Sequence, residues 1–116
     1  ARRRSRAAEI VLGRLAVDVA IYRDRVQVTE RKSGFFVDKR ADLPFSTDER
    51  LIADAARFEH ALSHALRQIL RNGGYMLYKP SALVGPTDPP LSPEDRDLVR
   101  KVLRDTGFRE IEFRDE

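Results

Sequence analysis

The chain has 116 residues, of which 41% are hydrophobic and 35% charged, and it contains no cysteine. This composition excludes a disordered chain, and the length suits one domain with one core. The absence of cysteine excludes disulfide bonds and thiolate chemistry. No apolar run approaches the length of a membrane-spanning helix, so we expect no membrane span and a cytoplasmic location.

A basic cluster begins the chain, with arginines at positions 2, 3, 4 and 6 (Arg2, Arg3, Arg4 and Arg6). Without these four charges the formal net charge falls from +3 to −1, so the basic character belongs to a tail and not to a folded face. We divide the chain into a tail with its lead-in, residues 1–14, and one domain, residues 15–116. The tail can bind nucleic acid through phosphates, or it is a solvated terminus or a linker remnant of a longer protein.

Three strands are predicted next, joined by short turns. Leu15 to Tyr22 alternates with both faces largely apolar, which indicates a central strand covered on both sides, and Asp18 is its one polar residue. Arg25 to Arg31 and Phe35 to Lys39 complete an antiparallel meander. We expect the third strand at an edge of the sheet, where it offers a protein interface through Phe35, Val37 and Lys39.

A long helix is predicted from Ser46 to Arg71, because apolar residues recur there at steps of three and four. Ser46 and Glu49 have the spacing of a capping box, and Phe45 is placed to pack on the first turn as a hydrophobic staple. The glycines of Asn72-Gly73-Gly74 would end this helix.

The fourth strand is less clear from the sequence. Two short apolar runs, Tyr75 to Tyr78 and Ser81 to Val84, flank Lys79-Pro80. Because proline cannot sit inside a central ladder, we predict that at most one run is the buried strand, and we favour Ala82 to Gly85.

A second helix and a last strand follow a proline-rich connection. Ser92 is a cap, Pro93 takes the first helical position, and Gly107 is the stop. Phe108 to Phe113 then forms a strand, with alternate apolar and acidic residues.

The predicted order is therefore β-β-β-α-β-α-β, an α/β fold with a mixed sheet and helices packed on it, which is the ribonuclease H-like arrangement. The first subdomain of the actin-like ATPases is built in the same order. Leu15-Ala16-Val17-Asp18-Val19 resembles the first strand of the bacterial actin homologues that determine rod shape. Pro80 to Pro86 with Leu91 to Arg96 resembles their strand, proline turn and next helix, and Lys101 to Glu112 their continuation. The resemblance covers residues 15–116 and corresponds to the first subdomain only.

The resemblance implies that Asp18 lies beside the metal and the nucleotide phosphates, where the family has its first-strand aspartate. The family's glycine-containing phosphate hairpin is not matched, because Val19 to Asp24 holds neither glycine nor serine or threonine. The second phosphate hairpin and the adenosine pocket would lie in a second subdomain, for which this chain is too short. We therefore expect no nucleotide hydrolysis and no cofactor.

Three functions follow as hypotheses. The first is a non-catalytic domain that binds a protein partner or itself through an edge strand or a helix face. The second is a nucleic-acid-binding domain that uses the arginine tail. The third is a metal-dependent, ribonuclease H-like enzyme in which Asp54 or Glu59 joins Asp18. His60 and His64, spaced i, i+4, could hold zinc only with a third ligand, and no His-Glu-x-x-His order is present.

Overall fold

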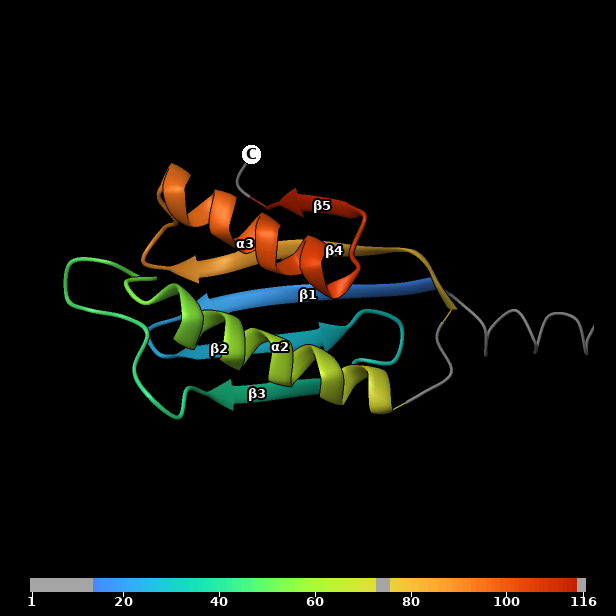
Figure 1. Ribbon diagram of the computed structural model, residues 1–116. Coiled ribbons are helices and arrows are strands. Elements are labelled where there is room, and N and C mark those ends of the chain that lie inside the picture. The colour runs from blue at the N-terminus through green and yellow to red at the C-terminus, as the bar shows by residue number, and fades with distance from the viewer. Residues whose placement is uncertain (1–13, 73–75, 115–116) are drawn as a thin grey trace, which may run out of the picture.

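A computed structural model describes residues 14–72 and 76–114, and in it five strands form one mixed sheet in the order β3-β2-β1-β4-β5 (Figure 1). The elements are β1 (Arg14–Tyr22), β2 (Arg25–Glu30), β3 (Phe36–Arg40), α2 (Ala55–Arg71), β4 (Met76–Asp88), α3 (Pro93–Thr106) and β5 (Glu110–Phe113). The first three strands pair antiparallel, while β4 runs parallel to both β1 and β5. The predicted element order and the mixed sheet are thus confirmed.

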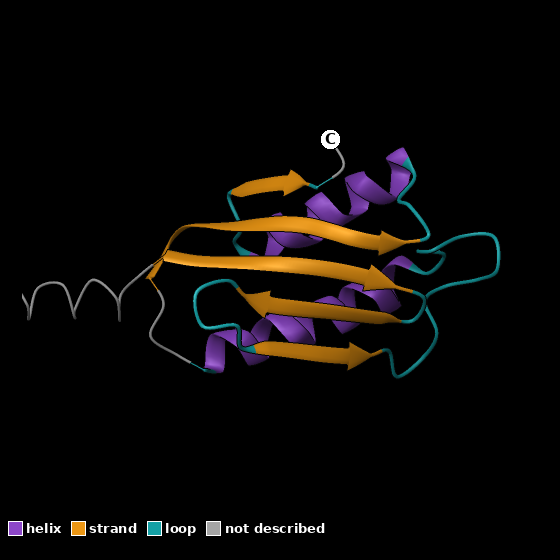
Figure 2. Ribbon diagram, turned by 180° about the vertical axis from the view of Figure 1, so that it is seen from behind, coloured by secondary structure: helices purple, strands orange, loops and turns teal. Residues whose placement is uncertain are grey.

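Both helices lie on one face of the sheet, and the view from behind shows the strands uncovered (Figure 2). The prediction that β1 is covered on both sides is therefore wrong among the described residues. Its odd-numbered residues from Leu15 to Ile21 face the helices and are buried, whereas Ala16 and Asp18 on the other side are only half-buried. We call that side the open face; one row of side chains across it consists of Phe36, Thr29, Asp18, Leu83 and Glu112.

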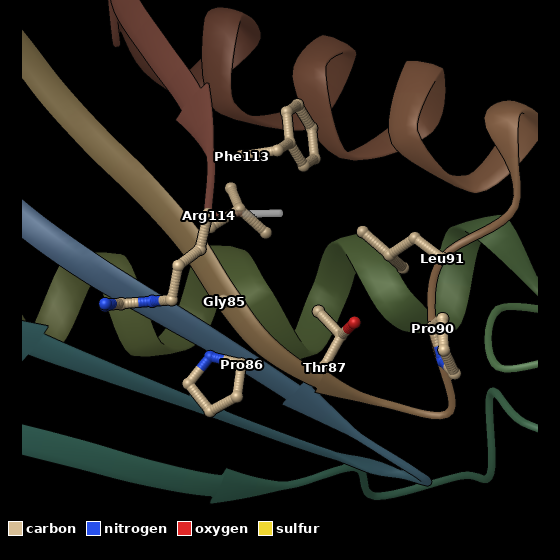
Figure 3. A pocket seen from close by; sticks show the side chains of 8 residues that line it. Gly85, Pro86, Thr87, Pro90, Leu91, Phe113 and Arg114 are labelled. Atoms are coloured by element: carbon tan, nitrogen blue, oxygen red, sulfur yellow. The ribbon is translucent and has the colours of Figure 1, made fainter. Parts of the chain in front are cut away.

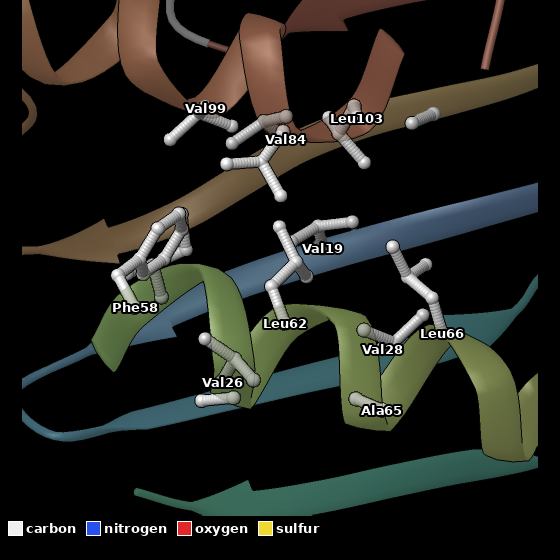
Figure 4. Packing of buried hydrophobic residues seen from close by; sticks show 14 of the residues in the cluster. Val19, Val26, Val28, Phe58, Leu62, Ala65, Leu66, Val84, Val99 and Leu103 are labelled. Atoms are coloured by element: carbon white, nitrogen blue, oxygen red, sulfur yellow. The ribbon is translucent and has the colours of Figure 1, made fainter. Parts of the chain in front are cut away.

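The hydrophobic core fills the space between the sheet and the two helices. In Figure 4, Leu62 of α2 points toward Val19 of β1, and Val99 and Leu103 of α3 lie over Val84 of β4. These side chains are at most 2% exposed. Apolar residues three and four apart on each helix pack against alternate residues of the strands. The helical and the strand patterns in the sequence therefore both mark residues of the same core.

The helix α2 begins at Ala55, so the prediction that it begins with a capping box at Ser46 and Glu49 is wrong. Asp54 is the cap, and its side chain accepts a hydrogen bond from the backbone N–H of Arg57 at 3.0 Å. Aspartate in extended conformation at this position satisfies one of the helix's unpaired amides, which is the function predicted for Ser46.

Ser46 does not cap the helix but is bound by Asp24, in the turn between β1 and β2. The Asp24 carboxylate accepts the backbone amides of Phe45 and Ser46 at 2.9 and 2.8 Å, and the Ser46 hydroxyl donates to the carbonyl of Leu51. Residues 45–54 therefore form a closed loop whose Leu51 is buried. Phe45 does pack on the first turn of α2, because its ring meets that of Phe58 edge-on at 5.3 Å.

The strand β4 runs through Lys79 and Pro80, although the proline predicted a break between the two apolar runs. Lys79 adopts a φ of 49°, and the register with β1 shifts between Arg14 and Ala16. An irregularity of this kind lets Pro80 enter a strand without taking a ladder hydrogen bond. In the favoured run, Ala82, Val84 and Gly85 are buried, as predicted for the buried strand.

The start and end of α3 agree with the sequence. The Ser92 side chain accepts from the backbone N–H of Asp95 at 3.1 Å, and Gly107 ends the helix with a φ of 115°. Asp95 is 3% exposed, and its carboxylate meets the Arg50 guanidinium at 3.0 Å. This ion pair ties the loop before α2 to the start of α3, and no part of it was predicted.

Glu30 is a buried carboxylate that closes the turn between β2 and β3. It is 2% exposed and accepts the backbone amides of Lys32 and Ser33 at 2.9 and 2.8 Å. Burial by itself raises the pKa of Glu30, but the hydrogen bonds from these two residues and the Lys32 charge outweigh it and hold the pKa below its ordinary 4.5.

We expect Glu30→Gln to lower the free energy of unfolding by about 1–2 kcal/mol at pH 7, because an amide replaces a carboxylate that accepts two N–H groups. The folded-state pKa of Glu30 is lowered, so its contribution is present above the unfolded pKa and is lost as pH falls through the folded pKa. The difference between wild type and variant should therefore shrink as pH falls below the ordinary pKa of 4.5 and through the lowered folded-state value. Urea unfolding at pH 7 and pH 3 measures it, with the exposed Glu59→Gln as control; an equal difference at both pH values would contradict it.

Candidate functional site

The strand β3 lies at one edge of the sheet, as predicted, with β2 as its one neighbour among the described strands. The N–H of Glu30 donates to the carbonyl of Phe35 at 2.7 Å, and the N–H of Ala41 donates to the carbonyl of Asp24 at 2.8 Å. Backbone groups of antiparallel strands alternate between facing the partner and facing away. These two bonds therefore fix which backbone groups of β3 face away from the sheet, namely those of Phe36, Asp38 and Arg40.

Three large apolar side chains are exposed in the described part of the chain, and all three border this edge. Phe35 is 39% exposed and Phe36 55% exposed at the start of β3, and Leu43 is 59% exposed just after its end. Single exposed apolar residues are common, but here all three lie along one edge of the sheet, two at the start of β3 and one after its end. We call β3 with Phe35 and Leu43 the β3 edge.

The other two residues predicted for a protein interface, Val37 and Lys39, face the helices. Val37 packs against the core, and the Lys39 amine bonds the Asp42 carboxylate at 3.0 Å. This hydrogen bond and the lysine charge lower the pKa of Asp42. Sequence reasoning missed Phe36 and Leu43, although the alternation of the strand already separated Phe36 from Val37.

A cavity of about 320 Å³ lies beside the β3 edge, between the loop that follows β3 and the first half of α2. Its walls are mostly apolar, and Leu43 forms one side of it. The lining residues are Asp42, Leu43, Ala56, Arg57 and His60.

Asp18, the predicted nucleotide- or metal-contacting residue, lies on the open face in the middle of the sheet. Its carboxylate pairs with the Arg31 guanidinium at 3.0 Å. Asp54 and Glu59 belong to α2 and its cap on the opposite face, so the structure does not bring these carboxylates together. Within residues 14–72 and 76–114, no group of three or more His, Cys, Asp or Glu side chains could hold a metal ion.

The two histidines of α2 have different surroundings. His60 lies 3.5 Å from the Asp42 carboxylate, whereas a ring nitrogen of His64 lies 3.0 Å from the Gln68 side-chain amide. Burial, followed by the charges of Lys39 and other nearby cations, lowers the pKa of His64. The pair therefore belongs to the polar side of α2 near the β3 edge.

A second cavity, of about 280 Å³, lies at the carboxyl ends of β4 and β5 (Figure 3). Its walls come from Val84, Gly85, Pro86, Thr87, Pro90, Leu91, Phe113 and Arg114. Strand ends of this kind often hold ligands in α/β proteins, but the walls here are mainly apolar. Arg114 lies close to Gly85, so close that a Cβ atom added to Gly85 would lie 2.7 Å from the Cβ of Arg114.

The arginine tail, with its predicted nucleic-acid contacts Arg2, Arg3, Arg4 and Arg6, lies outside the described residues. That contact stays a prediction. None of the helices in the described ranges is both long enough and apolar enough to cross a membrane.

Comparison with known proteins indicates the type of fold of this chain. No family model matches the chain, and no curated protein matches it. Among solved structures, the chain is similar to MreB5 of Spiroplasma citri, an actin-like protein whose structure was determined bound to ADP. The TM-score is 0.63 with 12% sequence identity, and the match covers 87% of this chain and 38% of that one. The likeness shows an actin-like fold, of which this chain spans well under half.

Proposed function

We propose that this chain is a non-catalytic protein-interaction domain with an actin-like sheet, and that a protein partner adds a strand to its β3 edge. The observation that carries the proposal is that Phe35, Phe36 and Leu43 are exposed beside a strand whose outer backbone groups face away from the sheet. In strand addition, main-chain hydrogen bonds supply the affinity and side-chain contacts supply the specificity.

The charges along the β3 edge also favour strand addition. Charged residues usually protect an edge strand from association. Here Lys39 bonds Asp42 at 3.0 Å, and Asp38 pairs with Arg25 on the neighbouring strand, also at 3.0 Å. Because these charges are already paired within the chain, an incoming strand meets less uncompensated charge than the sequence alone would indicate.

Three features support a function without nucleotide chemistry. The turn after β1, from Tyr22 to Arg25, contains no glycine that would let a phosphate approach the backbone. Asp18 is paired with Arg31. The nearest carboxylates of α2 lie on the other face of the sheet. The structural neighbour's ADP belongs to a protein more than twice the length of the matched region.

Nucleotide binding is tested directly by titrating the purified chain with Mg-ATP and with Mg-ADP while following backbone amide NMR shifts. We expect no shifts at millimolar nucleotide. Shifts clustered from Asp18 to Asp24 would overturn the non-catalytic proposal and favour the nucleotide hypothesis.

Strand addition is tested with Asp38→Pro. Proline removes the outward N–H of residue 38 but takes no hydrogen bond from the β2–β3 ladder, and it is tolerated on edge strands. The lost ion pair with Arg25 is exposed, so we expect the fold to persist at a cost below about 1 kcal/mol. Binding of a partner at the β3 edge should be lost in Asp38→Pro.

The matched control is Asp38→Asn, which keeps the N–H and removes the same charge. Immobilised wild type, Asp38→Pro and Asp38→Asn are each exposed to extract of the source cells, and bound proteins are quantified. A partner retained by wild type and Asp38→Asn but lost by Asp38→Pro supports strand addition. Partners held equally by all three folded proteins would overturn it.

A further inference from the structure

We propose that the strand added at the β3 edge is β3 of a second copy of this chain, antiparallel to the first, with residue 39 of each copy at the two-fold axis. This inference rests on the proposed use of the β3 edge and names its partner. The pairing would join two five-stranded sheets into one, with both open faces on the same side.

The backbone limits the registers that such a pair can adopt. The outward-facing groups belong to Phe36, Asp38 and Arg40, so an antiparallel partner must place even-numbered residues opposite even-numbered residues. Within β3 this leaves two-fold axes at residues 36 to 40, of which 36 and 40 pair most of β3 with residues beyond its ends; the axes at residues 37, 38 and 39 pair β3 mainly with itself.

The charges on the strand distinguish these registers. An axis at residue 38 places Asp38 opposite itself and Phe36 opposite Arg40, so it brings no opposite charges together. An axis at residue 37 places Phe36 opposite Asp38, which brings no charged pair together. An axis at residue 39 places Asp38 opposite Arg40 of the second copy, and symmetry repeats this ion pair on the other side of the axis.

The apolar residues select the same register independently. With the axis at residue 39, Phe35 of one copy comes beside the loop after β3 of the other copy, which carries Leu43. Phe35 shares its side of the strand with Val37, which faces the helices, and the cavity beside Leu43 lies on that side against α2. The cavity measures about 320 Å³ and is open to solvent. In the proposed pair the phenyl ring of one copy covers this cavity of the other.

The axis itself brings the two Lys39 side chains near each other. Each lysine is bonded to Asp42 of its own chain at 3.0 Å, and its side chain is 19% exposed. The neighbouring carboxylates offset the repulsion between the lysines, and they remain in place when the strands pair.

Single cysteine substitutions can determine the register of the two strands, because the chain has no cysteine of its own. Residues at a two-fold axis oppose themselves at Cα separations of about 4.5–5.5 Å, within disulfide range. Three variants are compared under mild oxidation: Val37→Cys, Asp38→Cys and Lys39→Cys. We expect a disulfide-linked dimer to form at least about tenfold faster for Lys39→Cys than for the other two. A fastest rate at residue 37 or 38, or equal rates at all three, would overturn the proposed register.

Charge reversal tests the same pairing without a new bond. Asp38→Arg places arginine opposite arginine, and Arg40→Asp places aspartate opposite aspartate, so each variant should dimerise at least about tenfold more weakly than wild type. An equimolar mixture of the two restores opposite charges at both positions, and we expect it to form a heterodimer with an affinity near that of wild type. Failure of the mixture to associate, with both variants folded by circular dichroism, would overturn the proposal.

Sedimentation velocity of the purified wild-type chain separates this inference from the proposed function. A dimer that appears with rising concentration and is lost in Asp38→Pro supports both. A wild-type monomer at about 1 mM overturns the second copy as partner. If that monomer still retains a cell protein that Asp38→Pro loses, strand addition itself stands.

Discussion

Replacing Phe58 by alanine is expected to lower the free energy of unfolding by about 3–5 kcal/mol, the usual cost of removing a fully buried aromatic side chain. Phe58 is 0% exposed and lies in the first turn of α2. Its ring meets Phe45 edge-on, with centroids 5.3 Å apart and ring planes at 79°. The substitution therefore leaves a cavity and also removes one of the contacts between the loop before α2 and the helix.

Urea unfolding followed by circular dichroism measures this loss. The matched control is Phe36→Ala, which removes the same side chain from a position that is 55% exposed on the open face. We expect the control to change the free energy of unfolding by less than about 1 kcal/mol. Similar losses in the two variants would contradict the core described above.

Gly85→Ala is expected to destabilise the chain by about 2–5 kcal/mol, from two separate causes. Gly85 has a φ of 142°, which residues with a side chain rarely adopt. A Cβ atom added there would also lie 2.7 Å from the Cβ of Arg114, which follows β5, the parallel neighbour of β4. The backbone N–H of Arg114 donates to the carbonyl of Val84 at 2.8 Å, so this segment is held in place and cannot easily move away.

Variants of the neighbouring residue separate the two causes. In the Gly85→Ala background, Arg114→Gly removes the clashing Cβ and should recover part of the stability, whereas Arg114→Ala keeps that atom and should recover none. Gly34→Ala gives the cost of positive φ alone, because Gly34 has a φ of 77° and no atom within 4 Å of the added Cβ. Equal rescue by Arg114→Gly and Arg114→Ala would show that the clash is not the cause.

The order of elements and most of the core follow from local patterns, because alternation and steps of three and four depend on nearby residues. The start of α2 does not, because Asp54 and Ser46 are both good caps. The choice between them is made by Asp24, a residue far away in the sequence whose carboxylate binds the loop amides. The passage of β4 through Pro80 likewise depends on a register shift against β1, which the sequence of β4 alone does not specify.

The β3 edge was predictable only where local patterns specify it. The edge position follows from the meander, and Phe35 was identified. Leu43 was missed because its exposure depends on the path of the loop after β3. The pairing of Asp18 with Arg31 joins residues on neighbouring strands, and the register of β1 and β2 brings them together. The family resemblance gave Asp18 a role by position, and that role stays a prediction.

The central position of β1 has a consequence for the order of folding. Its antiparallel pairing with β2 needs only the two-residue turn between them, so this hairpin can form within microseconds. Its parallel pairing with β4 must wait until the chain has closed a much longer loop that contains β3 and α2. Stabilising the turn at Asp24 would therefore favour an early nucleus, whereas changes in β4 and β5 would act mainly on the unfolding rate.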